Sequence, residues 1–310
     1  MRRNHEQLRT LTVRRAMTLV ELLIVGAVIA ILAALTLTAV SMVATTAKIT
    51  KTRATIQKID VAMQQIFEEY EERFLLLKNN KNVLTPQPTD EEWQQLTDEE
   101  QLRIAVHCLR DIMRMEMPQC WAEVSADPTK ITLNGKDYVL KHPSPLLEYY
   151  LQHGTASSAE LLFLIIQNLN PEALEAFHGS EIADTDGNGL LEFVDAWGKP
   201  IRFLRWAPAF TDSDLQPNVQ PWGDAEAAQK AKEQQPFLLG LGEGGHDDFG
   251  WFLYPLIYSA GPDGEYGIDE GDDVWNTDKE IDPCARPAGI PDGTGKHFDN
   301  IHNHRWFRSF

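Results

Sequence analysis

Apolar residues follow one another almost without interruption from Met17 to Ala47, and Glu21 is the single ionisable side chain among them. An α-helix rises about 1.5 Å per residue, so roughly 20 apolar residues cross a hydrocarbon core of about 30 Å. A carboxylate within a membrane-length helix is costly, and it is retained where a partner uses it. The pattern therefore predicts a transmembrane helix over residues 17–47, with Glu21 near its start.

This helix is expected to continue as an amphipathic helix over residues 48–78, which contain neither Pro nor Gly. Apolar and Thr side chains recur there at steps of three and four residues, which places them on one helix face. The stripe consists of Ile49, Thr52, Ile56, Ile59, Met63, Ile66 and Tyr70. A free coiled coil would have the same pattern, but this stripe lasts only about three heptads. We therefore expect it to pack against the protein's own sheet.

Residues 79–180 are expected to form a mostly helical insert. Ser or Thr followed by Glu three positions later is the spacing of a capping box, which starts a helix. Candidate boxes are Thr89 with Glu92, Thr97 with Glu100, and Ser157 or Ser158 before Glu160. Between the last two helices, residues 130–140 have the pattern of a small hairpin that turns at Asn134-Gly135.

The remaining residues, 181–310, are expected to form a sheet region with two acidic loops. Its strand candidates are Ile201–Trp206 and Trp251–Tyr258, and Pro255 places the second candidate towards a sheet edge because Pro has no N–H to donate. The predicted fold class is therefore α+β: a long N-terminal helix packed on a small C-terminal antiparallel sheet, with an extra helical insert.

The residues before the apolar run, 1–16, form a basic leader with five Arg and one Glu. By the positive-inside rule, the N-terminus stays in the cytoplasm and the rest of the chain is exported, so we expect a single-pass protein of the inner membrane. An ordinary secretory signal fits less well, because its apolar region has about 7 to 15 residues. A twin-arginine signal at Arg2-Arg3 or Arg14-Arg15 is weaker still, and an uncut membrane anchor remains an alternative.

The segment from Arg14 to Glu21, with the apolar helix that follows it, resembles the signal of type IV pilins and type II secretion pseudopilins. The resemblance implies that prepilin peptidase cuts after Ala16, that Met17 becomes the N-methylated terminus, and that Glu21 is the family's glutamate, the fifth residue past the cut. This chain has Ala16 where the family usually has Gly, and Met17 where it usually has Phe. In the implied filament, Glu21 of one subunit meets the amine of Met17 in its neighbour.

The charge balance limits which kinds of partner the chain is expected to bind. It has 28 Lys and Arg against 46 Asp and Glu, a formal net charge of -18 and a pI near 4.9. Such a surface repels nucleic acid and suits cations, so no nucleic-acid partner is expected. Acidic composition by itself usually means only solubility.

Three cysteines are too few for a disulfide framework. Cys108 and Cys120 flank a short predicted helical segment in an exported region, so one bridge between them is possible. Cys284 would then be left over, and the sequence leaves this pairing open.

The first acidic loop, residues 184–195, has the spacing of the twelve-residue calcium loop. Gly189 at position 6 allows the sharp turn, and no pair of helices flanks the loop, so we expect a free-standing site as in dockerin-type repeats. An Asx-rich turn without an ion is the alternative. Oxygen ligands are expected from Asp184, Asp186, Asn188, Leu190 through its carbonyl, Glu192, and Asp195 in place of the usual Glu.

The second acidic loop, residues 259–274, is interpreted through the resemblance to pseudopilins. The segment Asp195-Ala-Trp-Gly-Lys-Pro200 resembles the Asp-Pro-Trp-Gly-x-Pro segment that leads into the first sheet strand of major pseudopilins. Residues 259–274 resemble the calcium loop of those proteins. The resemblance implies that Ser259, Asp272 and Asp273 bind calcium, together with backbone carbonyls.

No hydrolase elbow, zinc-protease motif or phosphate loop is present in the sequence. We expect a structural role rather than an enzymatic one: a subunit of a type IV pilus or pseudopilus-like filament, assembled from copies of itself or related pilins and stabilised by calcium. His297, His302 and His304 match no standard ligand spacing, so packing is favoured over metal binding. The alternatives are a membrane-anchored calcium-binding or enzymatic ectodomain outside any filament, and a minor pilin or adhesin.

Overall fold

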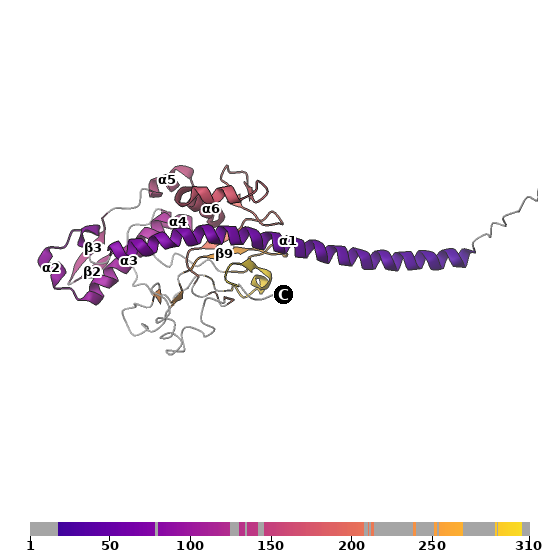
Figure 1. Ribbon diagram of the computed structural model, residues 1–310, viewed down its shortest axis with the longest axis horizontal. Coiled ribbons are helices and arrows are strands. Elements are labelled where there is room, and N and C mark those ends of the chain that lie inside the picture. Colours follow the sequence, from indigo (N-terminus) through magenta and orange to yellow (C-terminus); the bar gives the residue numbers. More distant parts are fainter. Residues whose placement is uncertain are drawn as a thin grey trace, which may run out of the picture. The chain divides into compact units, whose positions relative to one another are not determined.

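A computed structural model describes residues 18–77, 80–124, 130–133, 135–141, 146–207, 210, 212–213, 238–239, 251–252, 254–268, 289 and 291–305. The chain divides into two compact units between Ala47 and Lys48. The first helix, α1 (Leu19–Leu77), continues across this boundary without interruption (Figure 1). The predicted continuous helix is therefore confirmed over these residues.

The second half of α1 has the one-sided surface that the sequence predicts. Ile56, Ile59, Met63 and Tyr70 are each at most 2% exposed, and they belong to one hydrophobic core with residues of the insert and the sheet. Glu72, on the opposite face, is exposed. The stripe therefore packs inside the protein's own domain, as expected, and does not form a free coiled coil.

The insert is mostly helical, as predicted. Three of its helices begin with capping boxes, in which a Thr or Ser side chain accepts a hydrogen bond from the backbone of Glu92, Glu100 or Glu160. Its helical elements are η1 (Lys81–Val83), α2 (Asp90–Gln94), α3 (Asp98–Glu116), α4 (Trp121–Val124), α5 (Leu146–His153), α6 (Ser158–Leu169) and η2 (Pro171–Ala176). No disulfide joins Cys108 to Cys120, and Cys284 lies outside the described residues.

The insert also has a small sheet. The predicted hairpin is confirmed as β2 (Ile131–Leu133) and β3 (Lys136–Leu140), which pair antiparallel. A third strand, β1 (Leu84–Thr85), pairs with the other edge of β3. The sequence does not predict this strand, because two residues are too few to have a recognisable strand pattern.

The C-terminal region has short antiparallel strands. One three-stranded sheet has the order β10 (Ile301–His302), β9 (Leu256–Ser259) and β6 (Arg202–Leu204), with Phe203 opposite Ile257. The pairs β4 (Ile182–Ala183) with β5 (Glu192–Phe193), and β7 (Leu238–Leu239) with β8 (Trp251–Phe252), complete the described strands.

The edge position expected for the strand around Pro255 is wrong. The predicted strand from Trp251 to Tyr258 is split into β8 and β9, and β9 is the central strand of its sheet. Pro255 directly precedes β9, so its missing N–H removes no ladder hydrogen bond within the strand. The carbonyl of Pro255 is used instead, because it accepts a hydrogen bond from Asn303 at 2.9 Å.

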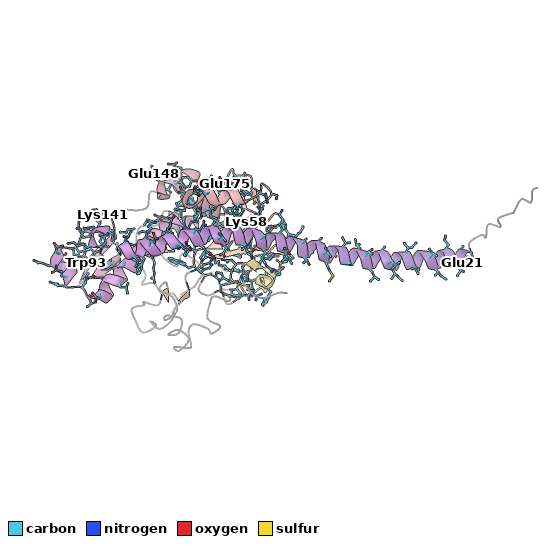
Figure 2. The ribbon with its side chains drawn as sticks, in the orientation of Figure 1. Glu21, Lys58, Trp93, Lys141, Glu148 and Glu175 are labelled. Carbon is cyan, nitrogen blue, oxygen red and sulfur yellow. The ribbon has the colours of Figure 1, made fainter. Side chains whose placement is uncertain are left out.

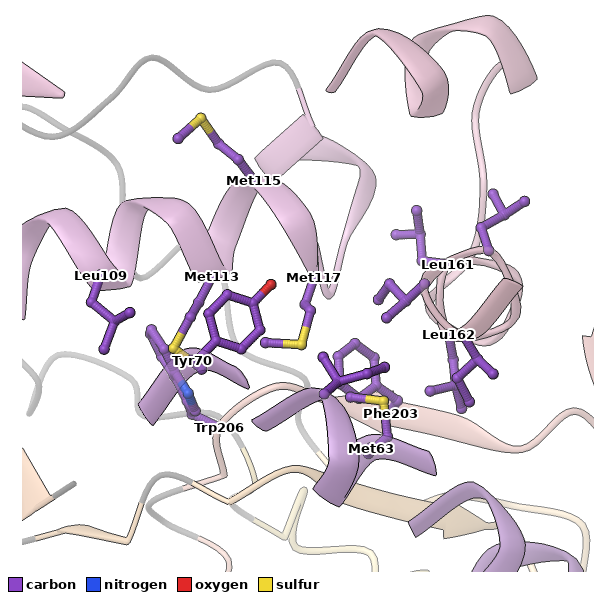
Figure 3. Packing of buried hydrophobic residues seen from close by; sticks show 14 of the residues in the cluster. Met63, Tyr70, Leu109, Met113, Met115, Met117, Leu161, Leu162, Phe203 and Trp206 are labelled. Atoms are coloured by element: carbon purple, nitrogen blue, oxygen red, sulfur yellow. The ribbon is translucent and has the colours of Figure 1, made fainter. Parts of the chain in front are cut away.

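The core is built where α1, α3, α6 and β6 meet. Figure 3 shows Met63 and Tyr70 of α1 close to Met117, Phe203 and Leu162. The helix α6 also lies against β5 and β6. The insert is therefore part of the same core as the sheet and not an appendage to it.

Ion pairs to buried carboxylates reinforce the attachment of the insert. Arg205, at the end of β6, contacts Glu123 of α4 through two bonds of 2.7 and 2.8 Å. On α1, Tyr70 Oη donates to Glu116 of α3 at 2.7 Å, and Arg73 pairs with the same carboxylate. Removing one member of such a buried pair leaves the other charge without compensation, so these contacts specify how the elements dock.

The C-terminal segment is folded into the interior. Asn303 donates to the buried carboxylate of Asp60 on α1 at 2.7 Å. The ring of His304 is fully buried; its Nε2 lies 3.1 Å from the carbonyl of Pro255 and its Nδ1 lies 2.9 Å from Ser213 Oγ. A carbonyl can only accept, so Nε2 carries the proton and Nδ1 accepts from the Ser213 hydroxyl. The neutral ring therefore holds this segment against the start of β9.

The buried His304 predicts a loss of stability in acid. Burial, and next the nearby His302, lower the pKa of His304 from 6.5 to about 3. Between pH 6.5 and about pH 3 the unfolded chain binds a proton that the folded chain does not. The free energy of unfolding therefore decreases by about 1.4 kcal/mol for each unit by which the pH is lowered. We expect His304→Gln to have a shallower slope between pH 6 and pH 4 in urea unfolding of the full chain in detergent.

The matched control for this prediction is His178→Gln, because His178 is exposed. This variant should keep the wild-type slope. An unchanged slope in His304→Gln would mean that another group determines the acid sensitivity.

Candidate membrane helix and cation-binding loops

The first half of α1 is apolar, and its described side chains are exposed. Side chains such as Leu22, Ile29 and Leu37 are each at least 60% exposed in the described structure. Among the described helices, α1 alone is long and apolar enough to cross a membrane. A helix that is apolar all round needs a nonpolar environment, because it has no polar face for water.

Glu21 has a local role that the sequence interpretation missed. The carboxylate of Glu21 accepts hydrogen bonds from Thr18 N at 2.8 Å and Thr18 Oγ1 at 3.0 Å, and Glu21 N donates to Thr18 Oγ1 at 3.2 Å. This is a capping box at the start of α1, where Figure 2 labels Glu21. The signal was available, since Thr18 and Glu21 have the same spacing as the boxes in the insert. The predicted processing residues, Ala16 and Met17, lie outside the described residues.

Residues 184–191 of the first acidic loop connect β4 to β5, and its last residues form β5 and the start of the following turn. Because these two short strands pair with each other, the loop is the tip of a hairpin and has no flanking helices, as expected for a free-standing loop. Asp184 accepts hydrogen bonds from Gly187 N at 2.7 Å and Gly189 N at 2.9 Å, and Asp186 accepts from Asn188 N at 3.1 Å. These turns place several predicted ligands around one short stretch of backbone.

Asn188 and Leu190 continue this arrangement. The Oδ1 atom of Asn188 accepts from Leu190 N at 2.8 Å. Gly189 has a φ of 94°, which glycine adopts readily and which matches the sharp turn expected at this position.

Glu192 is the buried member of the loop. Its side chain is 2% exposed, and its Oε1 accepts hydrogen bonds from Thr185 N at 3.0 Å and from Thr185 Oγ1. Its Oε2 has no hydrogen-bond partner among the described residues. The pKa of Glu192 is raised, first by burial and then by the charges of Glu160 and Asp186. This carboxylate therefore has an oxygen able to bind a cation and is close to other carboxylates.

Asp195, the expected last ligand of the loop, has other partners. One carboxylate oxygen accepts from Trp197 N at 2.8 Å and Lys199 N at 2.9 Å, and the other accepts from Ser259 Oγ at 2.7 Å. The structure thus joins a predicted ligand of the first loop to a predicted ligand of the second. The contact connects the turn after β5 to the end of β9.

The second acidic loop is described as far as Ile268, so Asp272 and Asp273 lie outside the described residues. Ser259 Oγ, which donates to Asp195, also accepts from Gly261 N at 3.1 Å. A Cβ built on Gly261 would lie 2.2 Å from the carbonyl oxygen of Asp299. This glycine is therefore explained by the close approach of the C-terminal segment.

Glu160 is a second residue that the sequence interpretation did not assign to a site. Its Oε2 accepts from Ser157 N in the capping box of α6, and its Oε1 accepts from Asn188 Nδ2 at 2.6 Å. The capping box marked this residue as a helix start. Its contact with the first loop bridges 28 positions of sequence, and no local pattern reports such a contact.

Neither loop, as described, holds its acidic side chains in a finished metal site. Within the described part of the chain, no three Asp, Glu, His or Cys side chains are grouped so that they could hold an ion. The first loop nevertheless fits a hard cation by its donors, which are carboxylate and amide oxygens, and by the unpartnered Oε2 of Glu192. Comparisons with protein-family models, curated proteins and solved structures found no match.

The Asp195–Ser259 contact predicts coupled destabilisation. Asp195→Ala should lower the free energy of unfolding by about 3 kcal/mol, and Ser259→Ala by about 1 kcal/mol, because hydrogen bonds to a buried charge are lost. The double variant should lose less than the sum, with a coupling energy on the order of 1 kcal/mol. Urea unfolding of the full chain in detergent with a calcium chelator measures this without any ion.

The control cycle pairs Asp195→Ala with Ser180→Ala. Ser180 is exposed and lies in a different loop, so these two changes should be additive. Additivity in the Asp195–Ser259 cycle would contradict the contact.

Proposed function

We propose that this protein is a pilin-like, single-pass membrane protein that assembles with copies of itself or related pilins into a type IV pilus or pseudopilus-like filament. The observation that carries the proposal is the difference between the two halves of α1. From Thr52 to Tyr70 the apolar stripe is covered by the protein's own core, whereas the apolar side chains from Leu19 to Val43 are exposed. This first half therefore requires a nonpolar environment that the described domain does not supply.

A membrane and a bundle of identical helices can each supply that environment. The backbone hydrogen bonds of a helix are satisfied internally, so the same helix is stable in lipid and against other helices. We propose that α1 first anchors the chain in the inner membrane, with its N-terminus in the cytoplasm and its domain exported. It then packs beside α1 of neighbouring subunits.

Glu21 would have its second role in this assembly. After prepilin peptidase cuts behind Ala16, the new amine of Met17 would lie near the start of α1, and Glu21 of a neighbouring subunit would neutralise it. In a low dielectric, their attraction offsets part of the cost of desolvating both charges. The capping box with Thr18 uses one oxygen of the carboxylate, Oε2, so the other oxygen is available for a neighbour.

Calcium is proposed to stabilise the exported domain through the first acidic loop, and through the second if Asp272 and Asp273 join Ser259. An ion that binds only the folded chain stabilises it by about 2.7 kcal/mol at a concentration 100 times its Kd. No catalytic role is proposed.

The mass of the mature N-terminus in a membrane fraction tests the proposal directly. We expect a chain that begins with N-methylated Met17, because the segment from Arg14 to Glu21 has the arrangement of a prepilin signal. An intact Met1 would instead identify an uncut anchor with a calcium-binding or enzymatic ectodomain. A cut beyond residue 47 would identify a released protein, and either result would reject the filament proposal.

Glu21→Gln separates the assembly role from the capping role. Gln can take the place of Glu in a capping box, so α1 should still form and insert in the membrane. The negative charge is lost, so we expect the amount of sheared filament to fall at least about tenfold, which corresponds to about 1.4 kcal/mol. Quantitative immunoblotting of membrane and filament fractions measures both quantities.

Two control variants make this result interpretable. Glu72→Gln removes a carboxylate from an exposed position on the same helix and should leave filaments unchanged. Thr18→Val removes the capping hydroxyl but keeps the Glu21 charge, so it should retain most filaments. Normal filaments from Glu21→Gln, or their loss in Thr18→Val alone, would reject the assembly role of Glu21.

A further inference from the structure

The part of α1 that directly follows the apolar run is basic, although the chain as a whole is strongly acidic. The formal net charge is -18, yet the sequence has no Asp or Glu between Glu21 and Asp60. The basic residues of this interval all come after the apolar run, and they are Lys48, Lys51, Arg53 and Lys58. A short basic segment therefore separates the apolar half of α1 from the acidic part of the chain.

The distance along α1 from Glu21 to Lys48 matches the thickness of a lipid bilayer. Lys48 follows Glu21 by 27 positions, and both belong to one uninterrupted helix. At about 1.5 Å per residue this is about 40 Å, and a bilayer with both of its headgroup layers is about 40–45 Å thick. A span that has Glu21 among the headgroups of one leaflet therefore has Lys48 among those of the other, and Lys51 follows one turn later.

The ammonium groups of Lys48 and Lys51 have only neutral partners in the described part of the chain. Lys51 Nζ donates to Ser180 Oγ at 3.4 Å, and Lys48 Nζ lies 5.7 Å from the centre of the Trp197 ring. Both lysines are exposed. The next lysine on the helix, Lys58, differs because it pairs with a buried carboxylate at 2.7 Å. The positive charges at positions 48 and 51 are therefore available to a negatively charged group outside the domain.

Trp197 is held beside Lys48 by the turn after β5. Ala196 N donates to Thr52 Oγ1 at 3.0 Å, and Trp197 N donates to Asp195 at 2.8 Å. Lys48 and Thr52 are four positions apart, so they lie on the same face of α1. The Trp197 ring packs against the edge of the core and is only partly buried. Trp is enriched at the level of lipid headgroups, because its ring is apolar and its N–H is polar.

The position of these side chains selects lipid phosphate as their partner. In a helix each Cα–Cβ bond is tilted towards the N-terminus, so the stems of Lys48 and Lys51 start in the direction of the apolar half. The surface potential of anionic lipids attracts basic residues beside a transmembrane helix and falls off within about 10 Å of the surface. Lys48 directly follows the apolar run, so it lies within this range whenever α1 spans the membrane.

We propose that Lys48, Lys51 and Trp197 form a surface that binds the headgroups of anionic phospholipids. The two lysines bind the phosphates, and the indole ring lies between the headgroups. This inference rests on the membrane anchoring proposed above and adds a partner to it. The surface fixes the depth of α1 in the bilayer and holds the start of the exported domain at the membrane.

Fluorine NMR of the full chain labelled with fluorotryptophan tests the position of Trp197. The chain is placed in nanodiscs that hold one copy and contain equal amounts of phosphatidylcholine and phosphatidylglycerol, with a nitroxide on some headgroups. The Trp197 signal, identified by its loss in Trp197→Phe, should be broadened by the nitroxide. The Trp93 signal is the internal control and should stay sharp, because Trp93 belongs to α2, at the end of the domain away from Lys58 (Figure 2).

The double variant Lys48→Gln with Lys51→Gln tests the two charges. In the same nanodiscs, electron paramagnetic resonance of spin-labelled lipids measures the preference of the chain for phosphatidylglycerol over phosphatidylcholine. We expect a preference of at least about fivefold in the wild type and its loss in the double variant. The matched control is Lys130→Gln with Lys141→Gln, which removes two exposed lysines from the insert and should keep the wild-type preference.

Three outcomes would overturn the proposal. A sharp Trp197 signal in an embedded chain would assign this surface to another partner, such as a neighbouring subunit, and leave the membrane anchor intact. A wild-type lipid preference in the double variant would remove the two lysines from lipid binding. Release of the chain from the nanodiscs by alkaline carbonate would overturn the membrane anchor as well, because an embedded helix resists this treatment.

Discussion

The buried face of α1 from Thr52 to Tyr70 is the surface on which the described domain depends. Its apolar side chains belong to the same core as α3, α6 and β6. Polar side chains on the same helix bind segments that lie far apart in the sequence, namely the turn after β5, the residue before β4, the segment before β9, the C-terminal segment and α3. These contacts pair Thr52 with Ala196, Thr55 with Glu181, Asp60 with Tyr254 and Asn303, and Tyr70 with Glu116. The helix therefore specifies both the packing and the relative register of the elements around it.

Both halves of α1 form backbone hydrogen bonds within the helix, but their side chains suit different surroundings. Every helix closes its hydrogen bonds internally, so the side chains decide which environment it needs. The half within the domain presents a stripe and a polar face, whereas the half before Lys48 presents apolar side chains that the described structure leaves exposed. The assembly proposed above, in which a membrane anchor becomes part of a filament core, would make use of this difference.

Buried carboxylates fall into two groups in this fold. Asp195, Glu116 and Glu181 each accept hydrogen bonds from several donors, and Lys58 adds a charge to Glu181 at 2.7 Å. These groups join elements and need no ion. Glu192 differs, because one of its oxygens lacks a donor among the described residues and its charged neighbours are acidic. The calcium binding proposed for the first loop therefore rests on Glu192, whereas the satisfied carboxylates join elements of the fold.

The sequence by itself determined the elements that depend on near neighbours in the chain. The length and stripe of α1, the capping boxes of α2, α3 and α6, the β2–β3 hairpin and the turn at Gly189 all follow from spacings of a few residues. Only the tertiary structure placed β9 at the centre of its sheet, joined Asp195 to Ser259 and brought Glu160 to Asn188. These contacts join residues that are far apart in the chain, and each side chain could form hydrogen bonds of similar quality with several other residues. The packing of elements around α1 decides which partner is within reach, and the spacing of residues along the sequence does not show this.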